Sequence, residues 1–162
     1  MWKTSPDVAE GRFKDIIGAL VLHGDQLLVS RYDGLAAALT VKDSLPQVVW
    51  KHRLPAIGTS TYRDGRIYYG TLNGEVHAMN ALTGKMVWMT ETGQSVAHLT
   101  ATERGLVVVG TNGRVIYLSS DAGKMQWHDD VGGMVSTEPM ASQQEVYILT
   151  GNKAIYGMRL EH

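Results

Sequence analysis

The sequence contains no cysteine, little net charge and no long apolar run. Without cysteine the chain can form neither disulfides nor thiolate metal sites. Its 162 residues carry a formal net charge of −1 with lysine and arginine scattered, so we do not expect nucleic acid as a partner. No apolar stretch has the length of a membrane span, and no signal peptide is expected at the start of the sequence.

The sequence contains instead an internal repeat marked by tryptophan and glycine. Trp50, Trp88 and Trp127 are separated by 38 and 39 residues. Glycines keep nearly the same spacing in two further series, which are Gly34, Gly74 and Gly113, and Gly24, Gly65 and Gly105. Because two residue types recur in the same register, a unit of about 40 residues is repeated along the chain.

Each repeat has the pattern of four short β-strands. In the second repeat the expected strands are Arg66–Thr71, Glu75–Asn80, Lys85–Met89 and Val96–Thr102. Asn73 and Gly74 lie between the first two strands, and both tolerate the positive φ of a two-residue hairpin turn. The chain shows no helical periodicity, so the pattern predicts an all-β fold.

Tandem four-stranded units of this size are typical of the blades of a β-propeller. One such sheet is too small to bury both of its faces alone, so neighbouring sheets are expected to stack face to face. The apolar run Leu106–Val109 fits a strand that is covered on both faces. A parallel β-helix is the alternative fold, but its repeats are shorter and its turns are not hairpin turns. We therefore predict four blades of four antiparallel strands each.

The repeat also predicts the boundaries of the blades. The last repeat is incomplete, with three expected strands at Val135–Ser142, Glu145–Thr150 and Lys153–Met158, and Trp2-Lys3 resembles the missing Trp-bearing strand. We divide the chain into an outer strand with its connector (1–12), blade 1 (13–54), blade 2 (55–92), blade 3 (93–131), an incomplete blade 4 (132–159) and a tag remnant (160–162).

The residues around the second tryptophan of the repeat identify a repeat family. None of the repeat tryptophans is followed by aspartate, so the repeats are not of the WD40 type. The segment Gly74–Trp88, in which an apolar strand precedes Thr83-Gly84-Lys85 and then Trp88, resembles the quinoprotein-like (PQQ-like) propeller repeat. In that repeat the tryptophan docks against the next blade. The resemblance thus implies a structural docking role for Trp2, Trp50, Trp88 and Trp127.

Within this superfamily the chain is similar to the C-terminal half of the propeller lipoprotein of the outer-membrane β-barrel assembly machinery. The similarity lies in five segments, which are Trp2, Arg12–Ile16, Ser136–Ala141, Val146–Leu149 and Ala154–Met158. It implies an eight-blade ring of which this chain is half, with no enzymatic activity and no cofactor. It also implies a scaffold for protein partners that is periplasmic and outer-membrane associated in its full-length parent.

The same resemblance implies where a partner binds. In that family an acidic loop contacts the barrel-assembly protein itself, and Asp15 matches the first acidic position of the loop. Asp15 and its neighbours Arg12 and Lys14 are therefore the candidate partner-binding residues, on an exposed connector between blades. A solvated charged loop is the alternative interpretation.

Two other functions stay open. A fragment of a quinone-dependent dehydrogenase would need a calcium-binding set of acids and amides, and often adjacent cysteines, which are absent. A propeller sensor domain of a larger protein is the other.

Gly93–Ala97 comes close to a nucleophile elbow, but it joins two repeats of an all-β chain rather than a strand and a helix. The histidines show no metal-ligand spacing. We predict no catalytic, cofactor-binding or metal-binding residue.

A half-ring would expose the apolar faces of its two end blades, and such faces drive association. The last blade would also present an open edge that invites strand pairing. We therefore predict a homodimer of half-propellers in which Trp2-Lys3 of each copy fills the empty position in the other. A closed four-blade ring, filled by the chain's own Trp2, is the alternative.

Overall fold

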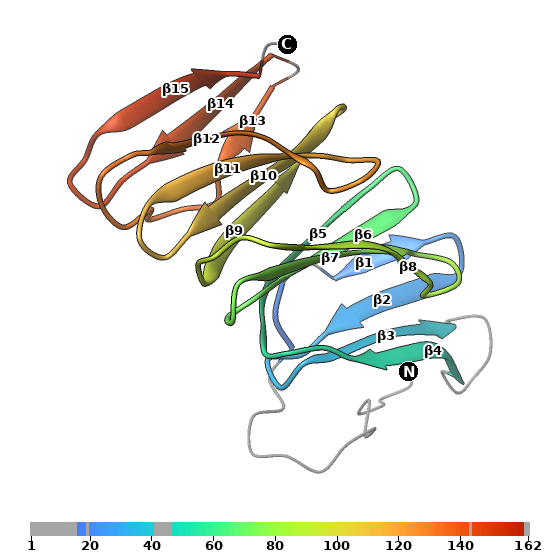
Figure 1. The fold of residues 1–162 in the computed structure, drawn as a ribbon. Coiled ribbons are helices and arrows are strands. Elements are labelled where there is room, and N and C mark those ends of the chain that lie inside the picture. Colours follow the sequence, from blue (N-terminus) through green and yellow to red (C-terminus); the bar gives the residue numbers. More distant parts are fainter. Residues whose placement is uncertain (1–15, 19, 41–46, 143, 161–162) are drawn as a thin grey trace.

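The strands form four antiparallel sheets that follow one another along the chain (Figure 1). The structure is a computed structural model, and it describes residues 16–18, 20–40, 47–142 and 144–160. Among these residues there is no helix, which confirms the predicted all-β fold. Within each sheet the strands are hydrogen-bonded in chain order.

Each of the first three sheets has four strands, and the fourth has three described strands. The first sheet consists of β1 (Val21–His23), β2 (Gln26–Ser30), β3 (Leu35–Thr40) and β4 (Gln47–Arg53). The second consists of β5 (Ile57–Arg63), β6 (Arg66–Thr71), β7 (Glu75–Asn80) and β8 (Met86–Glu91). The third consists of β9 (Val96–Ala101), β10 (Gly105–Gly110), β11 (Arg114–Ser119) and β12 (Met125–Asp130). The fourth consists of β13 (Met140–Ala141), β14 (Glu145–Leu149) and β15 (Ile155–Arg159).

The hairpin between β6 and β7 illustrates how the local sequence makes a turn. Gly74 has a φ of +94°, a conformation that residues with a side chain rarely adopt. The Thr71 hydroxyl accepts a hydrogen bond from the Glu75 N–H at 2.9 Å, and the Thr71 carbonyl accepts one from the Gly74 N–H at 3.2 Å. These bonds close the turn, so β6 and β7 begin and end where the sequence pattern places them.

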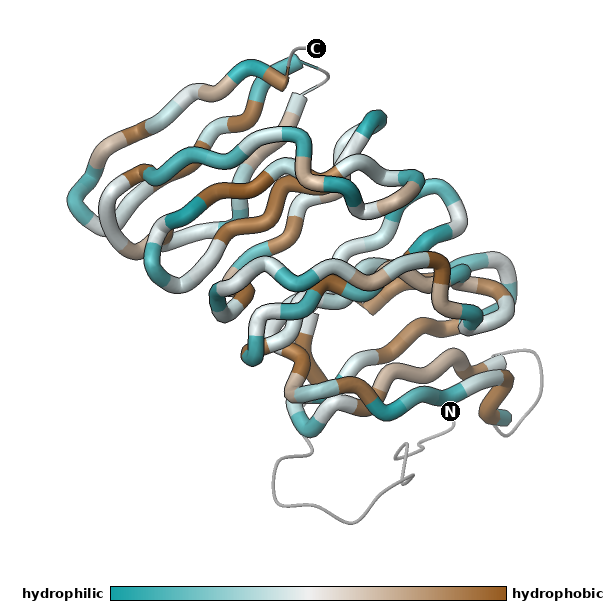
Figure 2. The backbone as a smooth tube through the Cα atoms, viewed as in Figure 1, coloured by the Kyte–Doolittle hydropathy of each residue, from teal (hydrophilic) through white to brown (hydrophobic). Residues whose placement is uncertain are grey.

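Apolar side chains fill the spaces between successive sheets. The hydrophobic positions, brown in Figure 2, recur along the strands of the sheets. In β10, Leu106 and Val108 pack with residues of the second sheet, whereas Val107 and Val109 pack with residues of the fourth sheet. All four side chains are fully buried. The continuous apolar run is therefore a strand covered on both faces, which explains why it lacks polar alternation.

In each of the first two sheets, one tryptophan is hydrogen-bonded to the following sheet. Trp50, on β4, donates its indole N–H to the carbonyl of Ala81 in the second sheet at 2.9 Å. Trp88, on β8, donates to the carbonyl of Ser120 in the third sheet at 3.0 Å. Both tryptophans are buried, although most other side chains of their strands are exposed. Each outermost strand is thus held to the neighbouring sheet mainly by its tryptophan.

Each of these indole rings lies on a glycine. Gly84 and Gly123 sit in the turns that join the third and fourth strands of the second and third sheets, with φ values of +69° and +65°. A Cβ added to Gly84 would lie 2.6 Å from Cδ2 of Trp50, and one added to Gly123 would overlap the ring of Trp88. The Thr-Gly-Lys pattern therefore has two causes, which are the left-handed turn and the close approach of the preceding sheet's tryptophan.

Trp127 differs from the first two tryptophans. It is half-buried, and its indole nitrogen is buried without a hydrogen-bond partner. In the fourth sheet, Leu160 takes the place of Ala81 and Ser120, because its N–H donates to the Gln144 carbonyl at 2.7 Å in the same pattern. Leu160 is the described part of the segment expected to be a tag remnant, and it is buried against the third sheet's core.

The innermost strand of the fourth sheet is shorter than the sequence pattern indicates. A strand is expected over Val135–Ser142, but β13 contains two residues, and Val135 forms an isolated bridge with Thr150. Pro139 precedes β13 and has no N–H for a ladder hydrogen bond. The proline therefore interrupts pairing between the bridge and β13.

The four sheets form an open arc, with the first and fourth sheets at opposite ends (Figure 1). Each end sheet has one face on which no other described sheet lies. On the first sheet that face carries an apolar cluster of Val29, Leu35, Ala37 and Leu39. On the fourth sheet it carries the exposed side chains of Tyr147, Leu149 and Ile155. The fold is therefore a partial propeller.

Replacing Gly123 by alanine tests the contact between tryptophan and glycine. We expect Gly123→Ala to lower the free energy of unfolding by about 2–4 kcal/mol, because alanine is strained at positive φ and its Cβ overlaps Trp88. Gly65→Ala is the matched control, since Gly65 has a φ of +76° but no atom within 4 Å of the added Cβ. Urea titrations of the two variants measure the difference. Equal losses of stability would contradict a role for the close contacts of Gly123 with Trp88 and Thr90 of the preceding sheet.

Candidate partner-binding surface

One face of the arc carries the turns that join the second and third strands of each sheet, and we call it the hairpin face. Its turns span residues 31–34, 72–74, 111–113 and 150–153. The connections between sheets lie on the same face, because their backbone N–H groups bond to carbonyls of these turns. The bonds run from Leu54 to Gly34 (2.8 Å), from Thr92 to Gly74 (2.8 Å) and from Val131 to Gly113 (3.1 Å).

A polar side chain occupies the same position in all four turns. The side-chain oxygens of Asp33, Asn112 and Asn152 accept hydrogen bonds from the backbone N–H two residues later, at 3.4, 3.1 and 3.3 Å. Asn73 instead donates its amide to Oε1 of Glu75 at 3.2 Å. The hairpin face is therefore a row of similar turns in which the exposed side chains differ.

The first turn carries an ionic cluster that sequence reasoning missed. Asp33 accepts hydrogen bonds from the guanidinium of Arg31 at 2.7 Å and from that of Arg53 at 3.1 Å. The side chain of Arg31 is 2% exposed, whereas that of Arg53 is 53% exposed. A buried guanidinium needs an opposite charge to compensate its lost hydration. The signal in the sequence is that aspartate stands where the other turns have asparagine.

The N-terminal connector joins the structure beside this cluster. Ile16 forms an antiparallel bridge with Arg31, and the Ile17 N–H donates to the Ser30 carbonyl at 3.0 Å. The segment that follows Asp15 is therefore attached to the hairpin face at its first turn. The candidate partner-binding residues Arg12, Lys14 and Asp15, and the docking residue Trp2, lie outside the described residues.

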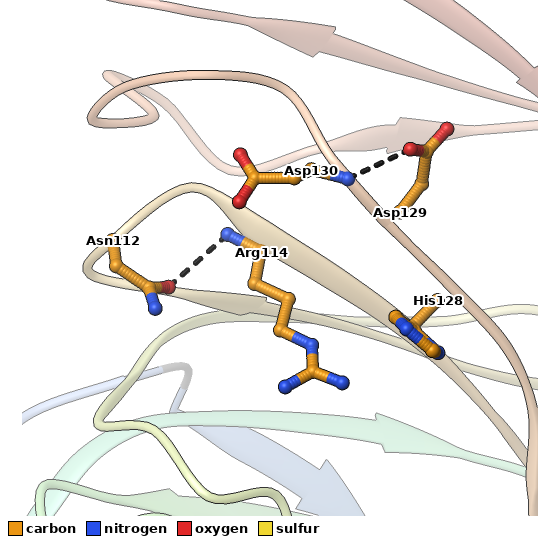
Figure 3. A pocket seen from close by; sticks show the side chains of 5 residues that line it. All are labelled: Asn112, Arg114, His128, Asp129 and Asp130. Carbon is orange, nitrogen blue, oxygen red and sulfur yellow. Dashed lines mark hydrogen bonds between the residues drawn. The ribbon is translucent and has the colours of Figure 1, made fainter.

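An open hollow of about 590 Å³ lies where β11 begins and β12 ends (Figure 3). It is lined by Asn112, Arg114, His128, Asp129 and Asp130. The carboxylates of Asp129 and Asp130 each accept a backbone N–H at 2.8 Å, and the Arg114 side chain points away from both (Figure 3). The hollow is thus lined by polar residues and offers charges of both signs to a polar partner.

The opposite face has a smaller cleft of about 250 Å³ between the second and third sheets. Arg66 crosses the cleft and donates to the carbonyl of Ser120. Arg63 lies 3.9 Å from Glu103 in the third sheet. A hydrogen bond from Ser119 lowers the pKa of Asp121. Arg66 and Arg63 thus connect the second sheet to the third, whereas Asp121 bonds within its own turn.

The described residues do not form a recognisable catalytic site. They contain no group of three or more His, Asp or Glu side chains that could hold a metal ion. Ser95, in the segment that approaches a nucleophile elbow, lies in the connection between β8 and β9, so a strand rather than a helix follows it. None of the described segments is a helix of the length and apolarity required to cross a membrane.

Stacked antiparallel sheets of the repeat length, the first two of which are tied to the next by a tryptophan on a glycine turn, define a β-propeller of the PQQ-like repeat class. Residues 46–161 match the family model described as outer membrane protein assembly factor BamB. This match covers more than half of the chain, and the chain belongs to that family. No curated protein sequence matches the chain.

Solved structures share the fold at low sequence identity. BamB from Moraxella catarrhalis has a TM-score of 0.73 and 17% identity, over 90% of this chain and 45% of that one. The chain thus spans about half the length of that protein. The computationally designed Ika4 protein has a TM-score of 0.80 and 15% identity, over 94% and 95% of the two chains. A europium-containing methanol dehydrogenase has a TM-score of 0.63 and 19% identity, over 78% of this chain and 26% of its own.

The likeness to a europium-containing methanol dehydrogenase raises the question of a metal ion. The described residues contain no group of three or more His, Asp or Glu side chains that could hold one, and the two chains share 19% identity. The likeness to this enzyme is therefore one of fold. The chain is a propeller scaffold whose distinctive polar features lie on the hairpin face.

Replacing Asp33 by asparagine separates the charge of the first turn from its shape. Asn occupies this position in the other turns, so Asp33→Asn keeps the turn but removes the negative charge beside Arg31. We expect a loss of about 2–4 kcal/mol in the free energy of unfolding, because the Arg31 charge stays buried. Arg53→Ala, which removes the exposed partner of Asp33, should cost less than about 1 kcal/mol. Chemical unfolding measures both, and a neutral Asp33→Asn would refute the role of the charge.

Proposed function

We propose that the chain is a non-enzymatic scaffold that binds protein partners during the assembly of outer-membrane β-barrel proteins. The observation that carries this proposal is the match of residues 46–161 to the BamB assembly-factor family. The hairpin face supports it, because polar turns presented by a rigid stack of sheets suit protein recognition. The proposal places the protein in the periplasm, associated with the outer membrane in its full-length parent.

The proposed partner is the barrel-assembly protein, and its proposed contact is the N-terminal connector. The contact residues are Arg12, Lys14 and Asp15. Asp15 immediately precedes Ile16, whose bridge with Arg31 attaches this segment to the hairpin face. A partner that binds the connector would therefore also lie near the first turn and its ionic cluster.

Charge reversal at Asp15 tests the partner contact. We expect Asp15→Lys to weaken capture of the barrel-assembly protein about tenfold, because loss of one charge pair at an interface costs about 1.5 kcal/mol or more. Asp121→Lys is the control, since Asp121 is exposed on the opposite face. Binding is measured by surface plasmon resonance with the immobilised partner. Equal affinities of Asp15→Lys and the unaltered protein would remove the connector from the contact.

We also propose that two copies of this chain associate as a homodimer that completes an eight-blade ring. The end face of the fourth sheet carries the exposed side chains of Tyr147, Leu149 and Ile155. The end face of the first sheet carries the apolar cluster of Val29, Leu35, Ala37 and Leu39, whose side chains are at most 5% exposed in the single chain. In the proposed ring the fourth sheet of one copy stacks on the first sheet of the other, which repeats the contact between successive sheets and requires the apolar face of the first sheet to be uncovered. A two-fold axis makes this contact twice, so both open ends of the arc are covered.

Sedimentation equilibrium tests the homodimer. We expect a species of twice the 17.7 kDa chain mass. Ile155→Arg should shift it to the monomer, because Ile155 is 73% exposed in the single chain and an arginine there would be buried unpaired between the copies. Met89→Arg is the control, since Met89 is 48% exposed on the outermost strand of the second sheet. A monomeric unaltered protein would exclude this assembly.

A further inference from the structure

In each four-stranded sheet the tryptophan of the fourth strand pairs with an equivalent residue of the third strand. The pairs are Ala38–Trp50, Ala78–Trp88 and Tyr117–Trp127. A β-bulge interrupts the pairing next to each tryptophan. The three complete sheets thus share one arrangement for accepting a Trp-bearing strand.

The fourth sheet has the same acceptor position on β15. Gly157 pairs with Tyr147 across the sheet, as Ala78 pairs with Tyr68 in the second sheet. In both sheets a tyrosine on the second strand thus faces a small residue on the third. The equivalence of Leu160 with Ala81 gives the same alignment independently.

The geometry of the second sheet shows what this pair accommodates. The rings of Tyr68 and Trp88 lie 5.8 Å apart at 43°, and Ala78 leaves room for the indole beside the strand. In the fourth sheet Tyr147 is 45% exposed, and the nearest side-chain atom to a Cβ on Gly157 would be the Tyr147 ring at 3.5 Å. Tyr147 and Gly157 thus form an exposed shelf at the positions that Tyr68 and Ala78 hold beside Trp88.

We propose that this shelf, together with the outer edge of β15, binds residues 1–5 of a second copy of the chain as an added antiparallel strand. Trp2 would lie on Tyr147 beside Gly157, and the backbone would pair with β15. This inference rests on the proposed homodimer and names its strand contact. The chain has four tryptophans, three of which lie on fourth strands. Trp2 is the fourth, and Trp2-Lys3 repeats the dipeptide Trp50-Lys51.

The arrangement of the sheets favours a second copy over the chain's own N-terminus. Ile16 is bridged to the first sheet, and β15 lies at the other end of the arc, with the second and third sheets between them (Figure 1). In the proposed ring the first sheet of the second copy stacks directly on this fourth sheet. The second copy's connector therefore starts one sheet away from β15, whereas the chain's own connector starts three sheets away.

Sedimentation of Trp2→Ala in the full chain tests the strand contact. We expect the dimer dissociation constant to rise about thirtyfold, the effect of losing a buried aromatic anchor. Lys3→Ala in the same segment is the control and should change it less than about threefold. Tyr147→Ala should match Trp2→Ala, and the double variant should be no weaker than either single one, because both remove the same contact.

A peptide with the sequence of residues 1–7 provides a readout that does not depend on dimerisation. When the peptide carries a fluorophore, its fluorescence anisotropy should rise on addition of the Trp2→Ala chain, because the peptide binds. It should not rise on addition of the Tyr147→Ala chain. A dimer that is unaffected by Trp2→Ala would overturn the strand contact and leave the ring proposal standing. An unaltered chain that is monomeric would overturn the homodimer itself. A monomer that Trp2→Ala destabilises would assign the shelf to the chain's own N-terminus instead.

Discussion

The fold depends on the docking of a tryptophan from one sheet onto a glycine turn of the next. Trp50 and Trp88 each donate an indole N–H to a carbonyl of the following sheet, and each covers a glycine in the turn there. The hydrogen bond fixes the direction of the ring, and the glycine permits its close approach. Together they set how far one sheet is shifted along its neighbour, which apolar packing alone would leave less well defined.

This contact also explains why the outermost strands tolerate polar and exposed residues. In β8 the side chains on either side of Trp88 are exposed. The strand is held by its ladder to β7, by the buried indole of Trp88 and by a hydrogen bond from the Thr90 hydroxyl to the Gly123 carbonyl at 2.7 Å. The first and second sheets each make this contact with the following sheet. The last sheet of an open arc has no following sheet to contact. The exposed Tyr147 lies on that last sheet, whereas Trp127, on the third sheet, packs with residues of the fourth sheet although its indole nitrogen has no hydrogen-bond partner.

Because the blades repeat one another, the residues that build them differ from the residues suited to recognising a partner. Glycines and tryptophans build each blade in the same way, so they cannot distinguish one blade from another. Differences between blades lie in the hairpin turns, where one position changes from asparagine to Asp33 and thereby holds Arg31 and Arg53 together. Ile16, the first described residue, bridges to Arg31 of this cluster, at the end of the hairpin face that holds the most distinctive turn. A scaffold that gains specificity in this way needs no pocket.

The sequence by itself determined the repeat, the all-β class, the hairpin turns and the family, because strand alternation and turn chemistry are local properties. Gly74, for example, requires a left-handed turn whatever surrounds it. The tertiary structure alone decided that Arg31 is buried, that Trp127 lacks a partner and that the arc stays open. These features depend on atoms brought together from distant parts of the chain, such as Arg53 with Asp33. No local pattern specifies which of many charged or aromatic side chains will meet, since that depends on how far each sheet is rotated and shifted against the next.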